Sequence, residues 1–359
     1  MSVLFSKATL GNISLQNHLV MCPLTRSRAV GNIPNDLMVE YYGQRASAGL
    51  IITEGTSPSP NGLGYARIPG IFSDAQVAGW KKVTDAVHAR GGRIFVQLMH
   101  TGRVGHQLNL PAGAKVVGPS AVAAAGQMFT DTEGMKPHPI PAAMTEAELK
   151  STIAEYAKAA TNAVAAGFDG IELHAANGYL LEQFIRPNSN QRTDAYGGSI
   201  EKRARFVLEV ADAAIAAIGK DKVGIRLSPF GVFNDMPLYP ELEADYGYLA
   251  QKLNEKGLVY VHLVDHSANG APPVPDSIKA TFRSMFKRSL ILSGGYDAER
   301  AERDLAAGKC DLIAVGKGFL ANPDLVTRWK DKAPLNAPDP TTFYTPGAKG
   351  YTDYPALAG

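Results

Sequence analysis

The sequence predicts an α/β protein built as a single closed (β/α)8 barrel, the TIM-barrel class. Short apolar, β-branched runs alternate with longer amphipathic segments along the chain, and the apolar runs number eight. These runs are nearly continuous, which is typical of parallel strands that are buried on both faces. Eight strands, each followed by a helix, are what a closed barrel requires, so we expect one domain over residues 1–359.

Helical patterns lie between the expected strands. Residues 73–90 place apolar side chains on one stripe and stop at Gly91-Gly92, and Thr145 with Glu148 forms a capping box at the start of a second helix. The same periodicity of three and four residues predicts the remaining helices. The expected helices cover 73–90, 145–166, 199–218, 241–255 and 297–307, and the expected strands cover 18–23, 50–54, 93–98, 170–174, 222–227, 260–264, 289–293 and 311–315.

Three segments fall outside this repeat. Residues 1–17 are expected to form a short cap over the barrel bottom. Residues 101–143 are rich in Gly and Pro and predict a long excursion after the third strand, and residues 334–359 form a similar tail. Long loops at the strand-exit face of a barrel usually build the substrate pocket.

Charge and cysteine content exclude several classes of function. The net charge is +2 and the basic residues are scattered, which argues against binding to nucleic acid or a membrane surface. The two cysteines, Cys22 and Cys310, lie too far apart in the sequence for a zinc quartet, an iron–sulfur site or a disulfide framework, and we read Cys22 as a packed core thiol. The N-terminus lacks a signal-peptide pattern and no apolar run reaches 18 residues, so a cytoplasmic protein is expected.

Hydrogen-bonding residues and glycines gather where the expected strands end. Because those ends meet on the active face of a barrel, we expect them to surround one site. The residues in question are Pro23, Leu24 and Thr25, Gly55, Gln97, His174 with Asn177, Arg226, His266, Gly294-Gly295 and Gly316-Lys317.

The glycines after the last two strands point to a phosphate. Gly294, Gly295 and Gly316 leave backbone N–H groups uncovered, and Lys317 adds a positive charge. Phosphate sites in these barrels lie at this position. The alternative is that the glycines only form tight turns.

Three residues after the fourth strand suggest chemistry on an oxygen-bearing substrate. If the segment turns helically, His174 and Asn177 share a face and can donate to one oxygen, as an oxyanion hole does. Tyr179 offers a phenolic proton for general acid catalysis. The alternative for His174 is a structural role, and a metal site is not expected because no ligand cluster completes it.

Arg226 and Gln97 end two further strands. A buried Arg needs an anion or a strong acceptor, and the structural alternative is an ion pair with Glu172. Gln97 could pair with the amide-like edge of a heterocycle, although taken alone it could equally be structural.

Several stretches resemble the Old Yellow Enzyme family of FMN-dependent ene-reductases along essentially the full chain, with bacterial reductases of the N-ethylmaleimide and pentaerythritol tetranitrate type as the most similar members. The most specific stretch is HAANGYLLEQFIRPNSNQRTDAYGGS over residues 174–199. The others are PLTR at 23–26, YYGQRASAGLIITEG at 41–55, FVQLMHTGR at 95–103 and KGYTDYP at 349–355.

The resemblance implies bound FMN and assigns residues to it. Thr25 would bond the flavin O4 and Pro23, Leu24 and Gly55 would contact the ring. Gln97 and Arg226 would hold the pyrimidine end, with the phosphate on Gly294, Gly295, Gly316 and Lys317. On the substrate side, His174 and Asn177 would bind the activating oxygen and Tyr179 would supply the proton, with Thr25, Tyr65, Met99 and Phe343 lining the pocket.

The implied reaction is a ping-pong cycle. NADPH, with NADH as the alternative, would pass a hydride to flavin N5, which would pass it to the β-carbon of an enone, enal, maleimide or nitroalkene, with nitro esters as a further class. The competing hypothesis is a non-redox barrel enzyme acting on a phosphorylated substrate, but it leaves Thr25 and Gln97 without a role. A monomer or small homo-oligomer is expected.

Two positions depart from the family pattern. Lys317-Gly318 stands where many relatives have Arg-Pro, which removes the bidentate guanidinium and predicts a looser hold on phosphate. Met99 stands where similar members often carry Trp, and its flexible thioether would change the pocket shape.

Overall fold

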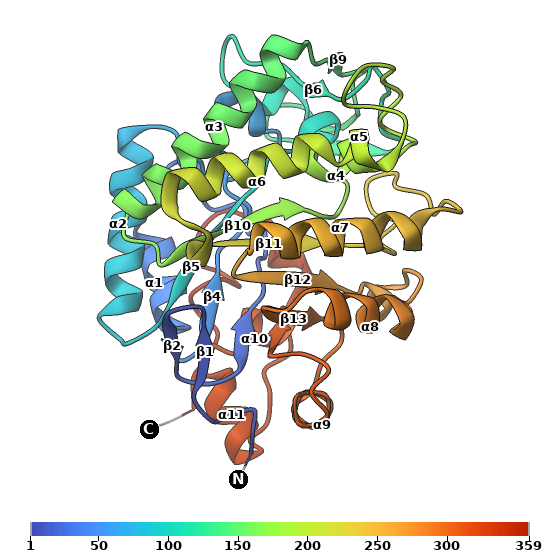
Figure 1. The fold of residues 1–359 in the computed structure, drawn as a ribbon. Helices are drawn as coiled ribbons and strands as arrows, with labels where there is room; N and C mark the ends of the chain where they lie inside the picture. Colours follow the sequence, from blue (N-terminus) through green and yellow to red (C-terminus); the bar gives the residue numbers. More distant parts are fainter. Residues whose placement is uncertain (1, 358–359) are drawn as a thin grey trace.

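A closed barrel of eight parallel strands forms the centre of the molecule in the computed structural model, which describes residues 2–357 (Figure 1). The last strand pairs with the first, so the sheet has no open edge. All eight predicted strands are confirmed, with ends within two residues of those expected. In barrel order they are β3 (Leu19–Met21), β4 (Leu50–Ile52), β5 (Ile94–Leu98), β10 (Gly170–Ala175), β11 (Val223–Leu227), β12 (Tyr260–Val264), β13 (Ser289–Ser293) and β14 (Leu312–Val315).

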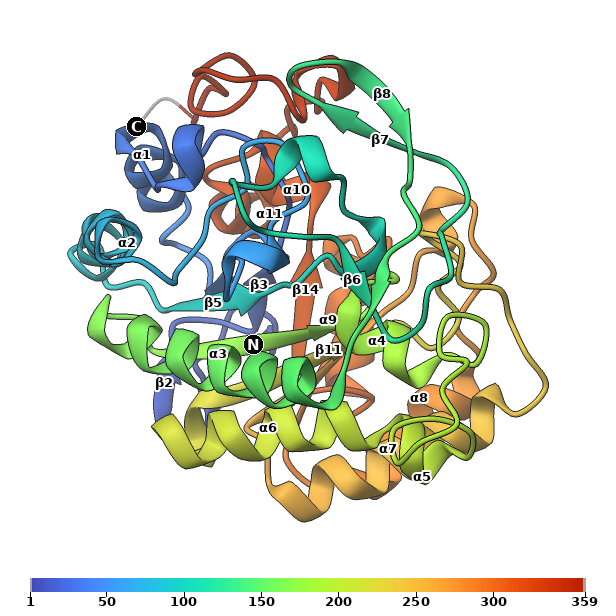
Figure 2. The same ribbon diagram turned by 90° about the horizontal axis from the view of Figure 1, so that it is seen from above.

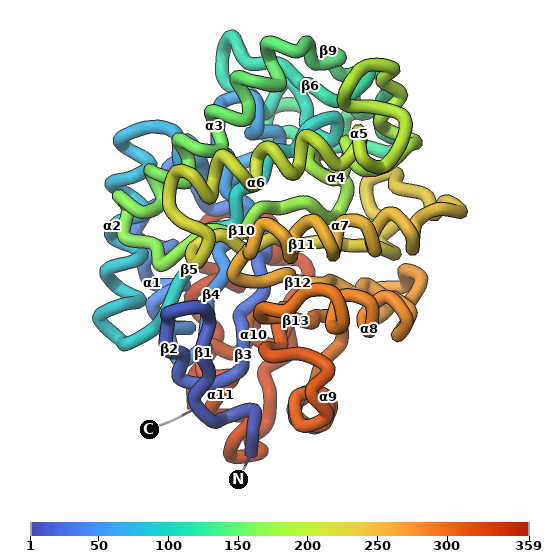
Figure 3. The backbone as a smooth tube through the Cα atoms, viewed as in Figure 1, coloured from blue at the N-terminus to red at the C-terminus, as the bar shows by residue number. Residues whose placement is uncertain are grey.

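Helices surround the barrel, and the tube in Figure 3 shows the chain passing between inner strands and outer helices. The five expected helical segments are confirmed, including the capping box in which the Thr145 side chain accepts from the Glu148 N–H. The helix expected over 199–218 is interrupted at Ala204, so this prediction needs one correction: the segment forms two helices. The helices expected from the sequence are α2 (Asp74–His88), α3 (Glu146–Ala165), α5 (Ile200–Arg203) with α6 (Arg205–Ile218), α7 (Leu242–Lys256) and α9 (Ala298–Ala306).

Five further helices were not expected from the sequence patterns. One of them is buried at all six positions, so it has no exposed face and no amphipathic repeat to reveal it. The five are α1 (Asp36–Gln44), α4 (Leu180–Ile185), α8 (Asp276–Met285), α10 (Lys317–Ala321) and α11 (Leu325–Asp331). Short 3-10 helices lie at Val30–Asn32, Pro60–Gly62, Gly102–Val104, Gln107–Asn109, Lys220–Lys222, Ser267–Asn269 and Pro340–Thr342. Through residues 2–357, no helix combines the length and the apolar character that spanning a bilayer would need.

The N-terminal segment closes the bottom of the barrel, as expected. It forms an antiparallel hairpin of β1 (Ala8–Leu10) and β2 (Ile13–Leu15). Leu10 and Leu15 are buried in a cluster with Val259 and Leu312, which lie where two barrel strands begin. This packing fills the end of the barrel opposite to the polar strand ends.

The excursion after β5 contains regular structure that the sequence patterns did not predict. β6 (Val117–Gly118) pairs with β9 (Ala142–Ala143), and β7 (Gln127–Thr130) forms a hairpin with β8 (Gly134–Pro137). Figure 2 shows this hairpin at the rim of the barrel, beside the C-terminal segment.

Buried arginines hold the C-terminal segment in place over the strand ends. Arg28 donates to the carbonyl oxygens of Thr342 (2.8 Å) and Lys349 (2.9 Å). Tyr351 stacks on Tyr41 with ring centroids 4.0 Å apart. These contacts place residues 342–351 against the barrel although they are more than 300 residues from Arg28 in the sequence.

Candidate active site

A cavity of about 730 Å³ opens at the carboxyl ends of the barrel strands. The parallel topology brings these ends together, so residues from the whole length of the chain meet in one place. Of the residues predicted from the sequence, those lining the cavity are Pro23, Leu24, Thr25, Gln97, Met99, His174, Asn177, Tyr179, Arg226, His266, Gly294, Gly295, Gly316, Lys317 and Phe343.

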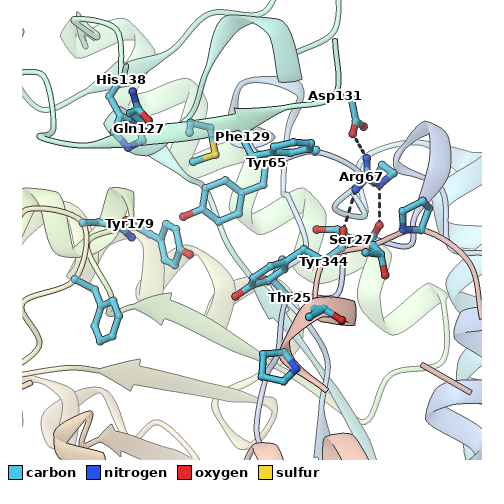
Figure 4. Close-up of a pocket in the computed structure, with 18 residues that line it drawn as sticks. Thr25, Ser27, Tyr65, Arg67, Gln127, Phe129, Asp131, His138, Tyr179 and Tyr344 are labelled. Carbon is cyan, nitrogen blue, oxygen red and sulfur yellow. Dashed lines mark hydrogen bonds and ion pairs between the residues drawn. The ribbon is translucent and has the colours of Figure 1, made fainter. Parts of the chain in front are cut away.

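A second cavity of about 830 Å³ adjoins the first, and several aromatic side chains line it. The two share lining residues, including Tyr179 and Tyr344. Figure 4 shows Tyr65, Tyr179 and Tyr344 directed into the same space. Tyr65 therefore lines the adjoining cavity. Tyr344 was not predicted from the sequence. It belongs to the C-terminal segment that the bonds of Arg28 hold over the strand ends.

Gly55 and Cys22 lie differently from what the sequence predicts for them. Gly55 lines neither cavity: it lies behind Met99, where a Cβ would be 2.4 Å from the Met99 sulfur. Its lack of a side chain therefore lets Met99 reach the cavity wall. Cys22 is buried among barrel side chains, as expected, but it also lines the cavity, and burial raises the pKa of its thiol to about 11.

Arg226 presents an unpaired guanidinium to the cavity. Its side chain is buried, and its Nε has no hydrogen-bond partner among residues 2–357. The alternative of a direct ion pair with Glu172 is not observed, because that carboxylate accepts from Gln97 Nε2 (2.8 Å), Tyr260 (3.0 Å) and His262 Nδ1 (2.9 Å). A buried cation without a partner is costly unless a ligand supplies an acceptor.

His174 is a neutral donor at the cavity wall. It is 3% exposed, and its Nδ1 has no partner within the described part of the chain. Burial lowers the pKa of His174 well below 6.5, and the positive charge of Arg226 lowers it further. The edge of its ring approaches Tyr179, with centroids 4.8 Å apart. The neutral imidazole can donate one N–H without adding charge.

The backbone of Asn177 is clamped on both sides. This residue adopts a left-handed conformation with φ of 58°. Its N–H donates to Ser228 Oγ at 2.8 Å, and its carbonyl accepts from Asn234 Nδ2 at 2.7 Å. Its side-chain Oδ1 lies 2.7 Å from His266 Nε2. The backbone of this residue is therefore fixed, and its Oδ1 is occupied by His266.

The buried carboxylate of Glu182 stabilises the turn at Asn177 and Gly178 through hydrogen bonds. Glu182 accepts hydrogen bonds from the Gly178 N–H (2.7 Å), Ser228 Oγ (3.1 Å), the Tyr246 hydroxyl (2.9 Å) and Arg186 Nε (3.0 Å). No role for Glu182 was predicted from the sequence. The signal that could have found it is a Glu–Arg pair four residues apart in a mostly apolar run, since buried charges must be paired.

Tyr179 carries a proton under all ordinary conditions. Burial raises the pKa of this phenol well above 10, and the neighbouring Tyr65 raises it further. The two rings meet edge to face with centroids 5.8 Å apart. A protonated phenol at the border of both cavities can serve as a proton donor.

Uncovered backbone donors lie at the ends of β13 and β14. The N–H groups of Gly294, Gly295 and Gly316 make no backbone hydrogen bond within residues 2–357. Gly294 has φ of 130°, and a Cβ there would be 2.3 Å from the Asp265 carbonyl, so only glycine fits. Lys317 Nζ lies 2.9 Å from Asn269 Oδ1 at the same end. This arrangement can bind an anion such as a phosphate.

Through residues 2–357, no group of three or more His, Cys, Asp or Glu side chains could hold a metal ion.

Comparison with known proteins identifies similar chains. The model of the NADH:flavin oxidoreductase / NADH oxidase family matches residues 3–336. A probable flavin mononucleotide-dependent alkene reductase from Leishmania infantum is 42% identical over 99% of this chain and 98% of its own. The 12-oxophytodienoate reductase 1 of rice (Oryza sativa subsp. japonica) is 42% identical over 97% of this chain and 91% of its own.

Solved structures agree with these matches. Morphinone reductase superposes with a TM-score of 0.96 at 47% identity and covers 99% of this chain and 96% of its own. The same enzyme in complex with tetrahydroNAD superposes with a TM-score of 0.94 at 47% identity, over 99% of this chain and 98% of its own. An old yellow enzyme homologue from Zymomonas mobilis gives a TM-score of 0.94 at 40% identity, over 99% of both chains.

Proposed function

The chain belongs to the NADH:flavin oxidoreductase / NADH oxidase family, and from this premise we propose that it binds FMN and reduces electron-poor carbon–carbon double bonds with electrons from a nicotinamide. The family match and the barrel confirm the resemblance to Old Yellow Enzyme and the predicted fold. The relatives are reductases, so a non-redox enzyme for phosphorylated substrates finds no support.

The unpaired guanidinium of Arg226 is the observation that carries this proposal. A flavin offers an acceptor edge that would satisfy it, and the uncovered N–H groups after β13 and β14 suit the FMN phosphate. When bound, FMN would supply the redox chemistry, the transfer of a hydride from a nicotinamide to the alkene. We assign the ring to Pro23, Leu24, Thr25, Gln97 and Arg226, with Gly55 behind Met99, and the phosphate to Gly294, Gly295, Gly316 and Lys317.

On the substrate side, two neutral groups bind the activating oxygen. His174 and Asn177 both line the cavity, and no hydrogen bond within residues 2–357 occupies the His174 ring or the Asn177 amide nitrogen. Two donors on one oxygen draw electron density from the conjugated double bond, as an oxyanion hole does. Tyr179 then supplies the proton for the α-carbon. Tyr65, Met99 and Phe343 shape the space for the rest of an enone, enal, maleimide, nitroalkene or nitro ester.

The charges at the outer chamber bear on the choice of nicotinamide. NADPH is the donor that the sequence resemblance implies, and it differs from NADH by a 2′-phosphate. The guanidinium lining this chamber, Arg67, is already engaged by Asp131 and by the Ser27 and Tyr344 carbonyl oxygens. Among the described residues that line this chamber, no guanidinium or ammonium group is therefore free to bind the 2′-phosphate of NADPH. We propose that NADH serves as donor alongside NADPH, with similar kcat/KM.

The state of the two cysteines bears on the cellular compartment of the enzyme. Cys22 and Cys310 are free thiols and both are buried, which suits a reducing compartment, and we propose a cytoplasmic enzyme. We further propose that it acts on small molecules as a monomer or a small homo-oligomer.

Anaerobic half-reactions test the proposal. Protein reconstituted with FMN should be yellow, should bleach with NADH or NADPH, and should recover its colour with 2-cyclohexenone. His174→Ala should weaken binding of a phenol, used as an oxygen-bearing ligand, and should slow recovery more than bleaching. Protein that stays colourless after incubation with FMN would refute the proposal.

A further inference from the structure

The loop after β12 places a histidine beside Asn177. His266 lines the first cavity and packs edge to face on Phe233, with ring centroids 4.5 Å apart. Its Nε2 lies 2.7 Å from Asn177 Oδ1, and this is the one hydrogen bond of its side chain to residues 2–357. The contact joins residues that are 89 positions apart in the sequence.

The direction of the Asn177 amide decides what the cavity offers. An amide carries an acceptor oxygen and a donor nitrogen of nearly equal size, so its two orientations differ little in shape but are opposite in polarity. The clamped backbone of Asn177 does not choose between them, because it fixes the Cα and not the end of the side chain. A partner for Oδ1 is what selects the orientation, and His266 is that partner.

We infer that His266 is a positioning residue: its Nε2–H donates to Asn177 Oδ1 and thereby keeps the amide nitrogen of Asn177 aimed into the cavity beside His174. This inference rests on the proposed function and deepens it. With the opposite orientation, an acceptor oxygen would face the substrate oxygen and repel it. His266 thus makes the site selective for alkenes whose activating group is an oxygen acceptor.

The charge state of His266 is consistent with this role. Burial lowers the pKa of His266 to about 4, and the positive charge of Arg226 acts in the same direction. At pH 7 the ring is neutral and carries a single N–H. With that proton on Nε2, as we infer, the ring donates to Asn177 without placing a second positive charge beside the guanidinium of Arg226.

Three variants of the FMN-loaded enzyme test the inference by phenol binding, followed through the flavin absorption band. His266→Phe keeps the aromatic contact with Phe233 but has no donor, and should weaken phenol binding about tenfold, the value of one hydrogen bond of this kind. His266→Gln retains an N–H donor of similar reach and should restore binding to within about threefold of the wild type. FMN affinity and the unfolding temperature should change little in either variant.

A double-mutant cycle shows whether His266 acts through Asn177. Asn177→Gly removes the amide while accepting the left-handed backbone. In that background, His266→Phe should cause no further loss of phenol affinity. A full tenfold loss there, or unchanged binding in the single His266→Phe variant, would overturn the inference while leaving the proposed function in place. A wild-type protein that takes up FMN but binds no phenol would overturn both.

Discussion

Replacing Glu182 by Gln should lower both stability and turnover, because this carboxylate stabilises a buried charge and supports the catalytic turn. The Glu182 and Arg186 side chains are 1% and 0% exposed and their ion pair measures 2.9 Å. Breaking a buried pair by removing one charge costs about 3–5 kcal/mol. At about 2.1 cal/mol/K per residue, 359 residues give an unfolding entropy of about 0.75 kcal/mol/K. The unfolding temperature should therefore fall by about 4–7 °C.

The same substitution should loosen the turn that carries the substrate-binding groups. A glutamine presents one acceptor where the carboxylate has two, so it cannot serve Arg186 and the Gly178 N–H together. Ser228, which holds the Asn177 N–H, also loses its negatively charged partner. Because small displacements of positioned groups reduce rates strongly, reoxidation of the reduced flavin by 2-cyclohexenone should slow by about 10–100-fold.

A double variant separates the two effects. In Glu182→Gln/Arg186→Met the unpaired charge is gone, so part of the lost stability should return. The turn still lacks its carboxylate, so the rate should stay low. Unfolding is measured by circular dichroism and reoxidation by anaerobic stopped flow. If the double variant regains the wild-type rate, Glu182 does not support the turn and the reasoning fails.

Three further variants test other parts of the site. Lys317→Ala should raise the FMN dissociation constant about tenfold, because one contact between an ammonium and the phosphate is lost; an unchanged constant would refute this role. Tyr179→Phe should slow alkene reduction about 10²–10⁴-fold with flavin reduction within twofold, and equal slowing of both half-reactions would argue against a proton donor. Burial raises the pKa of Glu54 to about 7 from a usual 4.5, so the folded state holds this proton more tightly and stability should fall as pH rises between those values. Glu54→Gln should remove up to about 3 kcal/mol of that decline, seen in urea unfolding at pH 5 and pH 8; an equally steep decline in the variant would rule Glu54 out as its source.

The barrel and much of the site could be predicted because both depend on local sequence. A strand buried on both faces appears as a continuous apolar run, and topology then brings the residues after each run to one face. For this reason Arg226 and the glycines after β13 and β14 were found by position alone, and the structure places all of them at the cavity.

What could not be predicted depends on contacts between distant or fully buried residues. α4 is buried at every position and shows no amphipathic repeat, so the hydrogen bonds that Glu182 makes to the turn could not be read from the sequence. The pairing of His266 with Asn177 spans 89 residues and leaves no local pattern. The position of Gly55 behind Met99 depends on how one side chain packs. The β7–β8 hairpin lies in a segment whose Gly and Pro content indicates a loop.

The site uses neutral donors around one fixed charge, and this choice has a physical cause. Arg226 and burial together lower the pKa of His174, so a second cation does not form next to the guanidinium. Burial keeps Tyr179 protonated, so the proton is held by a group that titrates far above neutral pH. An imidazolium at position 174 could transfer its own proton to the substrate oxygen, whereas a neutral imidazole polarises that oxygen by a hydrogen bond. Binding of the substrate oxygen and delivery of the proton are therefore assigned to different residues, and burial keeps both of them neutral.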